Sequence, residues 1–328
     1  MAAGLQECDA AAVSYNLTEA ERRGVYSHGL LLVPMYLNRI ASGAIARSYS
    51  IAEVYTHGAC VLLDGGSGPG QSIAFEAVRR GESRADELGV GLVTVRNSNH
   101  IGMLATYAME SASRGYVALI MTNASPSIGL PGGGPIVGNN AFCFAAPVLG
   151  TDPICLDMAT GVVATGKVRA LLLCHEPLPS EWLSDENGNP SADGRDLDRG
   201  GFVLAQGGYK GFGLSIVIDL LTAVLAGGAS SIEMRLRVAS GAAPGTTQTF
   251  LIIAPSLGLA RSSFSLDAAK YIQNLQAAAV RSDGKALLPG DLELQNARSK
   301  FVLIRRPLYD AVASLAEQLG VPNLSYFE

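Results

Sequence analysis

Two histidines of this sequence stand where residues that transfer protons are often found. His28 lies in Tyr-Ser-His-Gly, at an expected helix end, and His100 follows Asn-Ser-Asn at the end of an expected strand. Ligands of open α/β sheets gather beyond the carboxyl ends of strands, and histidine suits proton transfer near neutral pH. Either histidine could instead cap a helix or complete a local hydrogen bond, and position alone favours that plainer interpretation.

Asp157 and Lys210 are the charged candidates. Asp157 follows an expected strand and is expected to open a helix, where a carboxylate caps the helix N-terminus or meets a ribose hydroxyl. Lys210 stands between glycines in Gly-Gly-Tyr-Lys-Gly-Phe-Gly at an expected helix start. Backbone amides and a cation there would bind an anion, although a flexible loop with a solvated lysine explains the same pattern.

Generic cofactor and metal motifs are absent from the sequence. No G-x-G-x-x-G follows an expected strand, and the nearest run, Gly66–Gly70, has the wrong spacing and a proline. Gly161–Lys167 imitates a P-loop, but Val168 replaces the hydroxyl that would hold magnesium, and the apolar interior favours a helix. No pair of histidines has metal-ligand spacing. An ordinary Rossmann site, a P-loop and a metal site are therefore not predicted.

Strands and helices alternate along the chain, which is typical of an α/β protein. Strands are expected at 59–63, 90–96, 116–122 and 153–157, and helices at 71–84, 101–114, 158–173 and 210–226. Thr18 and Glu21 have the spacing of a capping box, which predicts a helix start there. Residues 125–140 are expected to form a long loop, and 176–208 a surface excursion or lid.

Composition excludes several classes of protein. The chain has 328 residues, enough for about two domains, and 48% hydrophobic with 16% charged residues excludes a disordered chain. A net charge of −5 without a Lys/Arg run argues against nucleic acid binding. Five dispersed cysteines and no basic, apolar leader predict a reducing, cytoplasmic location. The apolar run 211–228 contains Asp219, so a buried helix at a subunit contact is expected rather than a membrane span.

Taken together, the motifs resemble the type-2 malate/L-lactate dehydrogenase-like family, which includes sulfolactate and ureidoglycolate dehydrogenases and piperideine-2-carboxylate reductases. The resemblance spans roughly residues 15–300, and seven short motifs in the right order make it specific. They are Ser27–Gly29; Asn97–Gly102; Met121–Asn123 with Pro131–Gly133; Gly138–Asn140 with Phe144–Pro147; Leu156–Thr160; Gly208–Gly211; and Leu288–Gly290.

The resemblance implies a mixed α/β fold with a non-Rossmann nicotinamide-binding domain beside a helical domain. Residues 59–295 would form the cofactor domain, and 1–58 with 296–328 the helical domain for substrate and dimer contacts. It implies NAD or NADP as cofactor, an intimate homodimer, and hydride exchange between NAD(P)H and a small 2-oxo or 2-hydroxy acid, with neither nucleic acid nor membrane as a partner.

Site residues follow from the same resemblance. His100 and Ala124 would lie at the nicotinamide, and Lys210 would meet a phosphate or ribose of the cofactor. The proton donor would be His100, with Ser27 and His28 beside the substrate as a relay pair. The remaining cofactor contacts would be Asp157, Met158, Ala159, Pro289 and Gly290.

Two positions depart from the family pattern. Members usually have the motif S-H-G-x-x-R, in which the arginine binds the substrate carboxylate. In this chain Leu32 occupies the position of that arginine. Leucine cannot form the bidentate carboxylate clamp of a guanidinium. Either another cation serves, such as Arg22 or Arg23 turned inward, or the substrate is bulkier and less anionic at that end. Imine-reducing members carry an acid where this chain has Lys167, which favours an oxo acid. The alternative is a catalytically impaired paralogue that binds the cofactor without efficient turnover.

Overall fold

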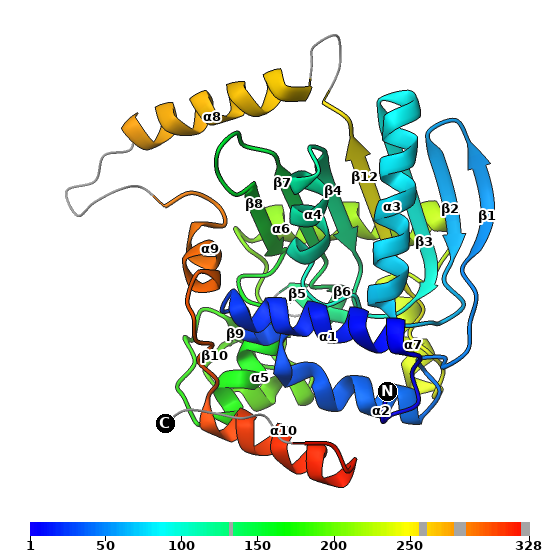
Figure 1. Ribbon diagram of the computed structural model, residues 1–328. Helices are drawn as coiled ribbons and strands as arrows, with labels where there is room; N and C mark the ends of the chain where they lie inside the picture. Colours follow the sequence, from blue (N-terminus) through cyan, green and yellow to red (C-terminus); the bar gives the residue numbers. More distant parts are fainter. Residues whose placement is uncertain (131–133, 256–260, 279–286, 323–328) are drawn as a thin grey trace.

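A seven-stranded mixed sheet forms the centre of the fold. The computed structural model describes residues 1–328 except 131–133, 256–260, 279–286 and 323–328, so the Pro131–Gly133 motif lies outside the described residues. The strand order is β1-β2-β3-β12-β4-β7-β8 (Figure 1). The strands are β1 (Ala52–His57), β2 (Cys60–Asp64), β3 (Val90–Ser98), β12 (Thr246–Ile253), β4 (Val117–Thr122), β7 (Ala141–Ala146) and β8 (Ile154–Ala159).

Only the β2–β3 pair of this sheet is parallel; its other neighbouring strands run antiparallel. Strand β12 returns from late in the chain and lies between β3 and β4. Its side chains are almost all buried, which is expected of a strand covered on both faces. The predicted mixed α/β class is confirmed, and the topology is not that of a doubly wound parallel sheet.

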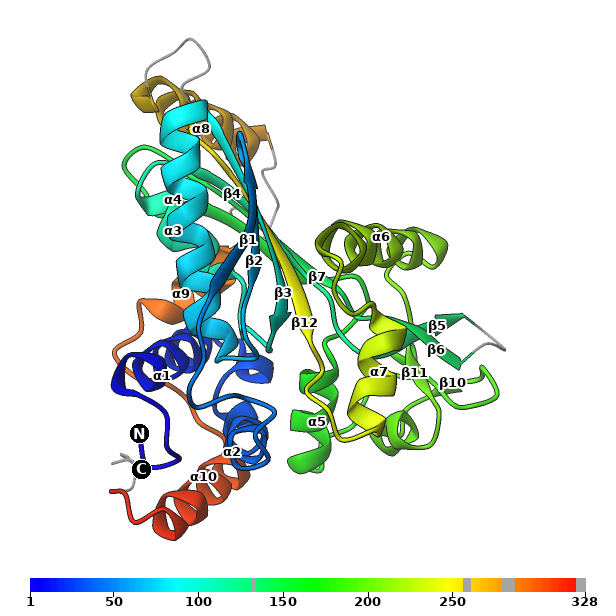
Figure 2. The same ribbon diagram turned by 90° about the vertical axis from the view of Figure 1, so that its right-hand side faces the viewer.

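Helices α3 (Gly70–Leu88) and α4 (Ala105–Ser113) cover one face of this sheet (Figure 2). Ile73, Ala77 and Val78 of α3 are buried in the same cluster as Val93 and Phe250 of the sheet. The α3 backbone comes so close that a Cβ on Gly91 would lie 2.1 Å from the carbonyl oxygen of Gly81. Glycine is therefore required at this crossing.

A five-stranded sheet, β10-β9-β11-β5-β6, lies on the other side of the molecule with helices α5, α6 and α7 (Figure 2). Its strands are β5 (Pro126–Leu130), β6 (Gly134–Gly138), β9 (Leu183–Ser184), β10 (Pro190–Ser191) and β11 (Phe202–Val203). The helices are α5 (Thr165–Leu173), α6 (Tyr209–Asp219), which continues as a π-helix over Leu220–Val224, and α7 (Ser231–Ala239).

This second sheet overturns two sequence expectations. Residues 125–140 are not a long loop, because Pro126 occupies the first position of β5, where a missing N–H is tolerated. Residues 176–208 are not a lid, because Leu183, Phe202 and Val203 are completely buried. The helix expected at 158–173 begins only at Thr165, since β8 continues to Ala159.

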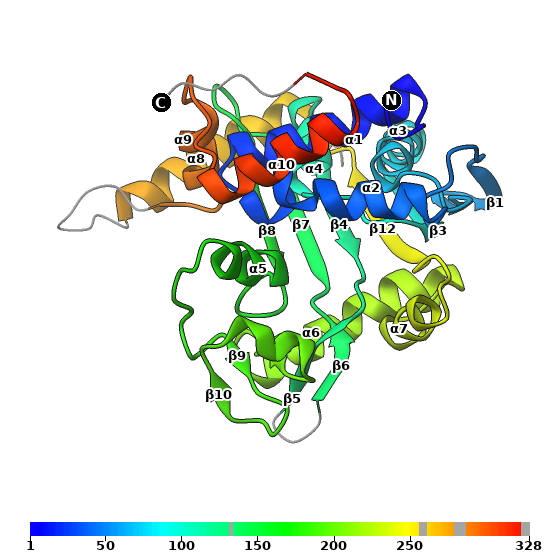
Figure 3. The ribbon, with the colours of Figure 1, turned by 90° about the horizontal axis from the view of Figure 1, so that it is seen from below.

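The N-terminal helices α1 (Glu7–Arg22) and α2 (Val33–Ala41) lie beside α10 (Arg306–Gln318) at one end of the molecule (Figure 3). Short 3₁₀ turns, Tyr26–His28 and Leu30–Leu32, connect α1 to α2. The capping-box prediction at Thr18 was wrong: α1 starts eleven residues earlier, with Glu7 and Asp9 in its first turn. Carboxylates there are favoured by the helix dipole.

Two further helices, α8 (Arg261–Ala278) and α9 (Asp291–Ala297), precede α10. In Figure 1 α8 extends away from the sheets, whereas α9 lies near α1. The segment from Leu287 to Gly290 leads into α9 and runs along β8, where the positive φ of Gly290 lets its backbone approach Cys155. Within the described part of the chain, no helix is both long and apolar enough to cross a membrane.

Candidate active site

A cavity of about 970 Å³ opens between the N-terminal helices, the large sheet and the second sheet. That volume is at the upper end of the usual range for ligand pockets, roughly 300–1,000 Å³. All of the predicted site residues line it except Lys210: Ser27, His28, His100, Ala124, Asp157, Met158, Ala159, Pro289 and Gly290. Five separate segments of the sequence thus meet at one cavity.

Lys210 lies outside the lining of this cavity. It occupies the first turn of α6, where it is exposed beside Tyr209. Gly207 and Gly208 both have positive φ values and turn the chain into the helix, as their motif suggested. The contact of Lys210 with a cofactor stays a prediction from the sequence.

His28 and His100 face each other at the floor of the cavity. Their rings are stacked, with centroids 5.8 Å apart and planes inclined by 13°. The hydroxyl of Ser27 lies 2.9 Å from Nδ1 of His28, the pairing that the sequence interpretation expected. The 3₁₀ turn that carries Ser27 and His28 packs against α5, where a Cβ on Gly166 would lie 2.6 Å from the Ser27 carbonyl oxygen.

The ring of His100 is fixed from its Nδ1 side. The backbone N–H of Gly102 donates to Nδ1 at 3.1 Å, and the Tyr36 hydroxyl lies 2.8 Å from the same atom. Gln71 in turn donates from Nε2 to the Tyr36 hydroxyl at 2.5 Å. Because Nδ1 accepts from Gly102, the neutral ring carries its proton on Nε2.

The electrostatic environment keeps both histidines neutral in the free protein. Burial lowers the pKa of His28 to about 4. Burial, together with the neighbouring His28 and Arg39, lowers the pKa of His100 well below its usual value. Burial disfavours the charged form of a base, and a like charge disfavours it further.

Glu21 supports the turn that carries the histidine motif. Its Oε1 accepts from the backbone N–H of Leu30 at 2.6 Å, and its side chain packs where a Cβ on Gly29 would stand. Burial raises the pKa of Glu21. Neither Glu21, Tyr36 nor Gln71 was predicted as a site residue, since each acts through another residue and carries no motif of its own.

Asp157 takes a different place from the one its sequence position predicted. It lies inside β8 and caps not its own helix but α4, accepting from the Ala105 backbone N–H at 2.7 Å. The Asp157 side chain lines the cavity and is accessible from it. Burial raises the pKa of Asp157 to about 6, against the lowering effect of the hydrogen bonds from Ala105 and Leu104.

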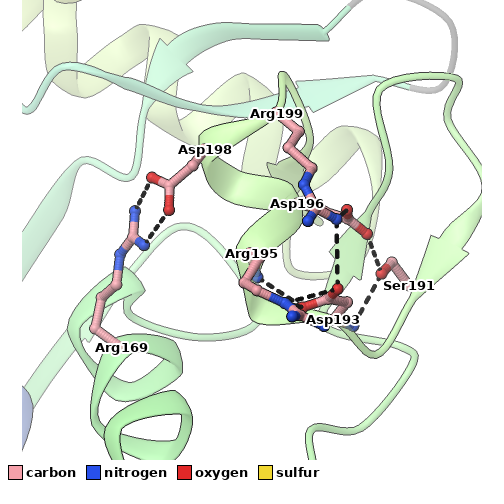
Figure 4. Close-up of polar contacts among 7 residues, drawn as sticks. All are labelled: Arg169, Ser191, Asp193, Arg195, Asp196, Asp198 and Arg199. Atoms are coloured by element: carbon pink, nitrogen blue, oxygen red, sulfur yellow. Dashed lines mark hydrogen bonds and ion pairs between the residues drawn. The ribbon is translucent and has the colours of Figure 1, made fainter.

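Three arginines line the cavity: Arg23, Arg39 and Arg169. The Arg169 guanidinium forms a two-bond ion pair with Asp198, at 2.6 and 2.5 Å (Figure 4). Arg23 is ion-paired with Glu19 at 3.4 Å. Arg22, the other residue considered from the sequence, is 43% exposed and is also ion-paired with Glu19, and it does not line the cavity.

The cavity residues fit a nicotinamide cofactor. The side chains of Leu104, Met109 and Leu156 give the wall apolar surface, and the Asp157 carboxylate offers an acceptor for a sugar hydroxyl. The described residues contain no cluster of metal-ligating side chains.

Comparison with known protein families identifies the class of protein to which this fold and cavity belong. Residues 1–301 match the malate/L-lactate dehydrogenase family, and the chain belongs to that family. The family that the sequence motifs predicted is therefore confirmed. The reaction expected from those motifs is the one that the dehydrogenases of this family catalyse.

Particular relatives agree with the assignment. Malate dehydrogenase of Pyrococcus abyssi is 37% identical over 71% of this chain and 66% of its own length, so the matched region spans about two thirds of that relative. Two solved structures cover nearly the whole chain. Malate dehydrogenase from Pyrococcus horikoshii has a TM-score of 0.89 at 27% identity, covering 98% of this chain and 92% of its own. Delta1-piperideine-2-carboxylate reductase from Pseudomonas syringae pvar. tomato has a TM-score of 0.85 at 30% identity, covering 96% and 95%.

Proposed function

We propose that this protein is an NAD(P)-dependent dehydrogenase that interconverts a small 2-oxo acid and its 2-hydroxy acid, malate- or lactate-like. The observation that carries the proposal is the His28–His100 pair. Its rings face the cavity whose walls also present Asp157, and Nδ1 of His100 is already bound, so that Nε2 is the atom left for a substrate.

In the proposed reaction His100 supplies the proton. When bound, the nicotinamide would exchange a hydride with the carbonyl carbon of the substrate. A bound 2-oxo acid brings a negative carboxylate near His100, which raises the pKa of the imidazole and favours its protonated form. The Nε2 proton then passes to the forming alkoxide, which leaves the ring neutral with its remaining proton on Nδ1. Loss of that proton to solvent and uptake of another at Nε2 restores the tautomer of the free site.

Tyr36 can serve both protonation states of His100. Its hydroxyl lies 2.8 Å from Nδ1 and 3.4 Å from the backbone carbonyl oxygen of His100. With neutral His100 the hydroxyl donates to Nδ1, and with charged His100 it turns to the carbonyl and accepts from Nδ1–H. Tyr36 is thus a positioning residue for the proton donor.

The two expected parts of the chain would contribute to opposite sides of this cavity. Residues 1–58 with 296–328 supply Ser27, His28 and Tyr36 beside the substrate. Residues 59–295 supply Asp157 and the 287–290 segment beside the cofactor. We keep this division, with NAD and NADP as alternative cofactors, as part of the proposal.

An assay of reduced cofactor against a panel of substrates tests the function. NADH and NADPH are each incubated with 2-oxo acids and with cyclic imines, and loss of the reduced cofactor is followed. We expect turnover of 2-oxo acids and none of the imines, since Lys167 stacks on Trp182 and offers no carboxylate to the cavity. Cofactor binding without turnover would favour the impaired paralogue, for which Leu32 is the best sequence support.

We also propose a cytoplasmic homodimer. The α6 helix and the π-helix that follows it present many exposed apolar side chains: Leu214, Ile216, Val217, Leu220, Leu221, Val224 and Leu225. An apolar face of this extent is expected to be covered by a second copy, with an interface above about 2,000 Å². The five cysteines are free, which agrees with a reducing compartment. Sedimentation as a monomer at micromolar concentration would contradict the dimer.

A further inference from the structure

Arg39 is a cation in the cavity wall without a partner charge. It lies on α2, lines the cavity, and is partly buried. No described residue forms an ion pair or a side-chain hydrogen bond with its guanidinium. Burial lowers the pKa of Arg39, as expected for a charge that has lost water without gaining an anion.

Arg39 also lies close to the proton donor. Its charge acts on both His100 and Tyr36, lowering the pKa of each side chain. The other two arginines of the wall are ion-paired: Arg169 with Asp198, and Arg23 with Glu19, a carboxylate that it shares with Arg22. Among the described cations, Arg39 alone combines a place in the wall, an influence on His100 and a free guanidinium.

The periodicity of α2 relates Arg39 to Leu32. The two residues are seven positions apart. Leu32 ends the 3₁₀ turn that leads into α2 and has helical backbone angles, so the helical period places it on the same side as Arg39, with Tyr36 between them. Leu31, Leu32 and Met35 also line the cavity. One end of this face is therefore apolar and the other cationic.

We propose that Arg39 binds the substrate carboxylate and that the substrate is a 2-oxo monocarboxylate whose side chain is apolar and contacts Leu31, Leu32 and Met35. This inference rests on the proposed function for the reaction and narrows its substrate to the lactate-like side. A second carboxylate, as in a malate-like substrate, would meet Leu31, Leu32 and Met35, whose side chains cannot neutralise it, which is unfavourable in a partly desolvated pocket.

Equilibrium binding tests the carboxylate site separately from turnover. The probe is 2-oxo-4-methylpentanoate, titrated calorimetrically into the cofactor-saturated dimer of the wild type, Arg39→Leu and Arg39→Lys. Losing a charge-assisted hydrogen-bonding partner should weaken binding by about 10- to 100-fold in Arg39→Leu. Arg39→Lys should recover part of the lost affinity, because an ammonium group keeps the positive charge but lacks the two parallel N–H donors of a guanidinium.

Arg22→Leu is the matched control, since it removes an exposed arginine near the same helix that does not line the cavity. It should bind the probe as the wild type does. Arg39→Leu should have a melting temperature no lower than the wild type, because it removes an unpaired charge. Equal binding by the wild type and Arg39→Leu, or no binding by the wild type, would overturn the proposal.

Turnover tests the substrate class. The wild type should reduce 2-oxo-4-methylpentanoate with at least tenfold higher kcat/KM than oxaloacetate, and the reverse order would overturn the substrate assignment. Arg39-dependent binding without turnover of any 2-oxo acid would contradict the proposed function and leave the carboxylate site standing. Turnover of 2-oxo acids that does not change in Arg39→Leu would support the proposed function and contradict the carboxylate site at Arg39.

Discussion

The Tyr36 hydroxyl lies 2.8 Å from Nδ1 of His100, and Gln71 holds that hydroxyl from its other side. Tyr36 belongs to α2 and His100 to the turn after β3, so this contact joins the N-terminal helices to the large sheet. It leaves Nε2 as the ring nitrogen of His100 that is available to a ligand.

Tyr36→Phe should keep the packing of the ring and lose the contact with Nδ1. One hydrogen bond is worth about 1 kcal/mol, so kcat should fall roughly fivefold while cofactor affinity holds. The pH profile of kcat should also move, since the hydroxyl serves both protonation states of His100. Unchanged kcat with an unchanged profile would show that Tyr36 only fills space.

His100→Gln should lower kcat by about 10²- to 10⁴-fold, the range for loss of a positioned general acid. Cofactor affinity, measured by fluorescence titration of the reduced cofactor, should stay within a few-fold of the wild type. His28→Gln serves as the comparison and should be milder. A large loss in His28→Gln with a mild one in His100→Gln would reverse the two roles.

Asp157 makes cofactor affinity depend on pH. The pKa of its carboxyl is about 6, so acidification through that value protonates the group and removes the acceptor for a sugar hydroxyl. The dissociation constant of the cofactor should therefore rise as the pH falls below about 6. In Asp157→Asn this pH dependence should disappear. A wild-type dissociation constant for the cofactor that does not change from pH 7 to pH 5 would contradict the contact of Asp157 with the cofactor.

His28 should make the folded state less stable in acid. Its pKa is about 4 when folded, below the unfolded value of about 6.5. The unfolded chain therefore binds more protons between these values, and stability is lost as the pH falls from about 6.5 to about 4. Asp157, with a raised pKa, acts in the opposite sense within part of this window.

The comparison of wild type with His28→Gln isolates the contribution of His28. In urea denaturation series between pH 7 and 4, the variant should show a slope of unfolding free energy against pH that is smaller by up to about one proton. Identical slopes would mean that His28 titrates normally in the folded protein.

Leu32→Arg should restore a second cation to the substrate face of α2. We expect kcat/KM for oxaloacetate to rise by at least about tenfold, or 1.4 kcal/mol of transition-state binding, with little gain for an apolar 2-oxo acid. Leu32→Met is the control of similar volume. A neutral or harmful effect of Leu32→Arg on oxaloacetate would show that position 32 does not face the substrate carboxylates.

The sequence predicted the parts of this molecule that local pattern determines. Strands such as β3 and β4 follow from apolar runs, whereas the meeting of Ser27, His28, His100 and Asp157 was expected from the family resemblance that the short motifs carry. The β5–β6 pair and the buried strands between 176 and 208 were missed, because glycine, proline and polar residues there are placed by tertiary contacts rather than by propensity.

The supporting residues could not be read from motifs. Tyr36 acts on His100 across 64 residues of sequence, and Gln71 acts on Tyr36 across 35. Glu21 acts on a backbone N–H nine residues away. Arg39 carried one unused signal, its position two turns beyond Leu32 on the same helix. Asp157 was placed at the right cavity but beside the wrong helix, since it caps α4 rather than the segment that follows it.

Transfer of isotope from cofactor to product tests the central claim most directly. The protein is incubated with NADH or NADPH carrying deuterium at the transferable C4 position and with an apolar 2-oxo acid, and the product is analysed by mass spectrometry. We predict that the wild type forms a 2-hydroxy acid with one deuterium at C2. In His100→Gln the rate of its formation should be at least about 10²-fold lower. No deuterated hydroxy acid from either cofactor, with a folded and cofactor-binding protein, would contradict it.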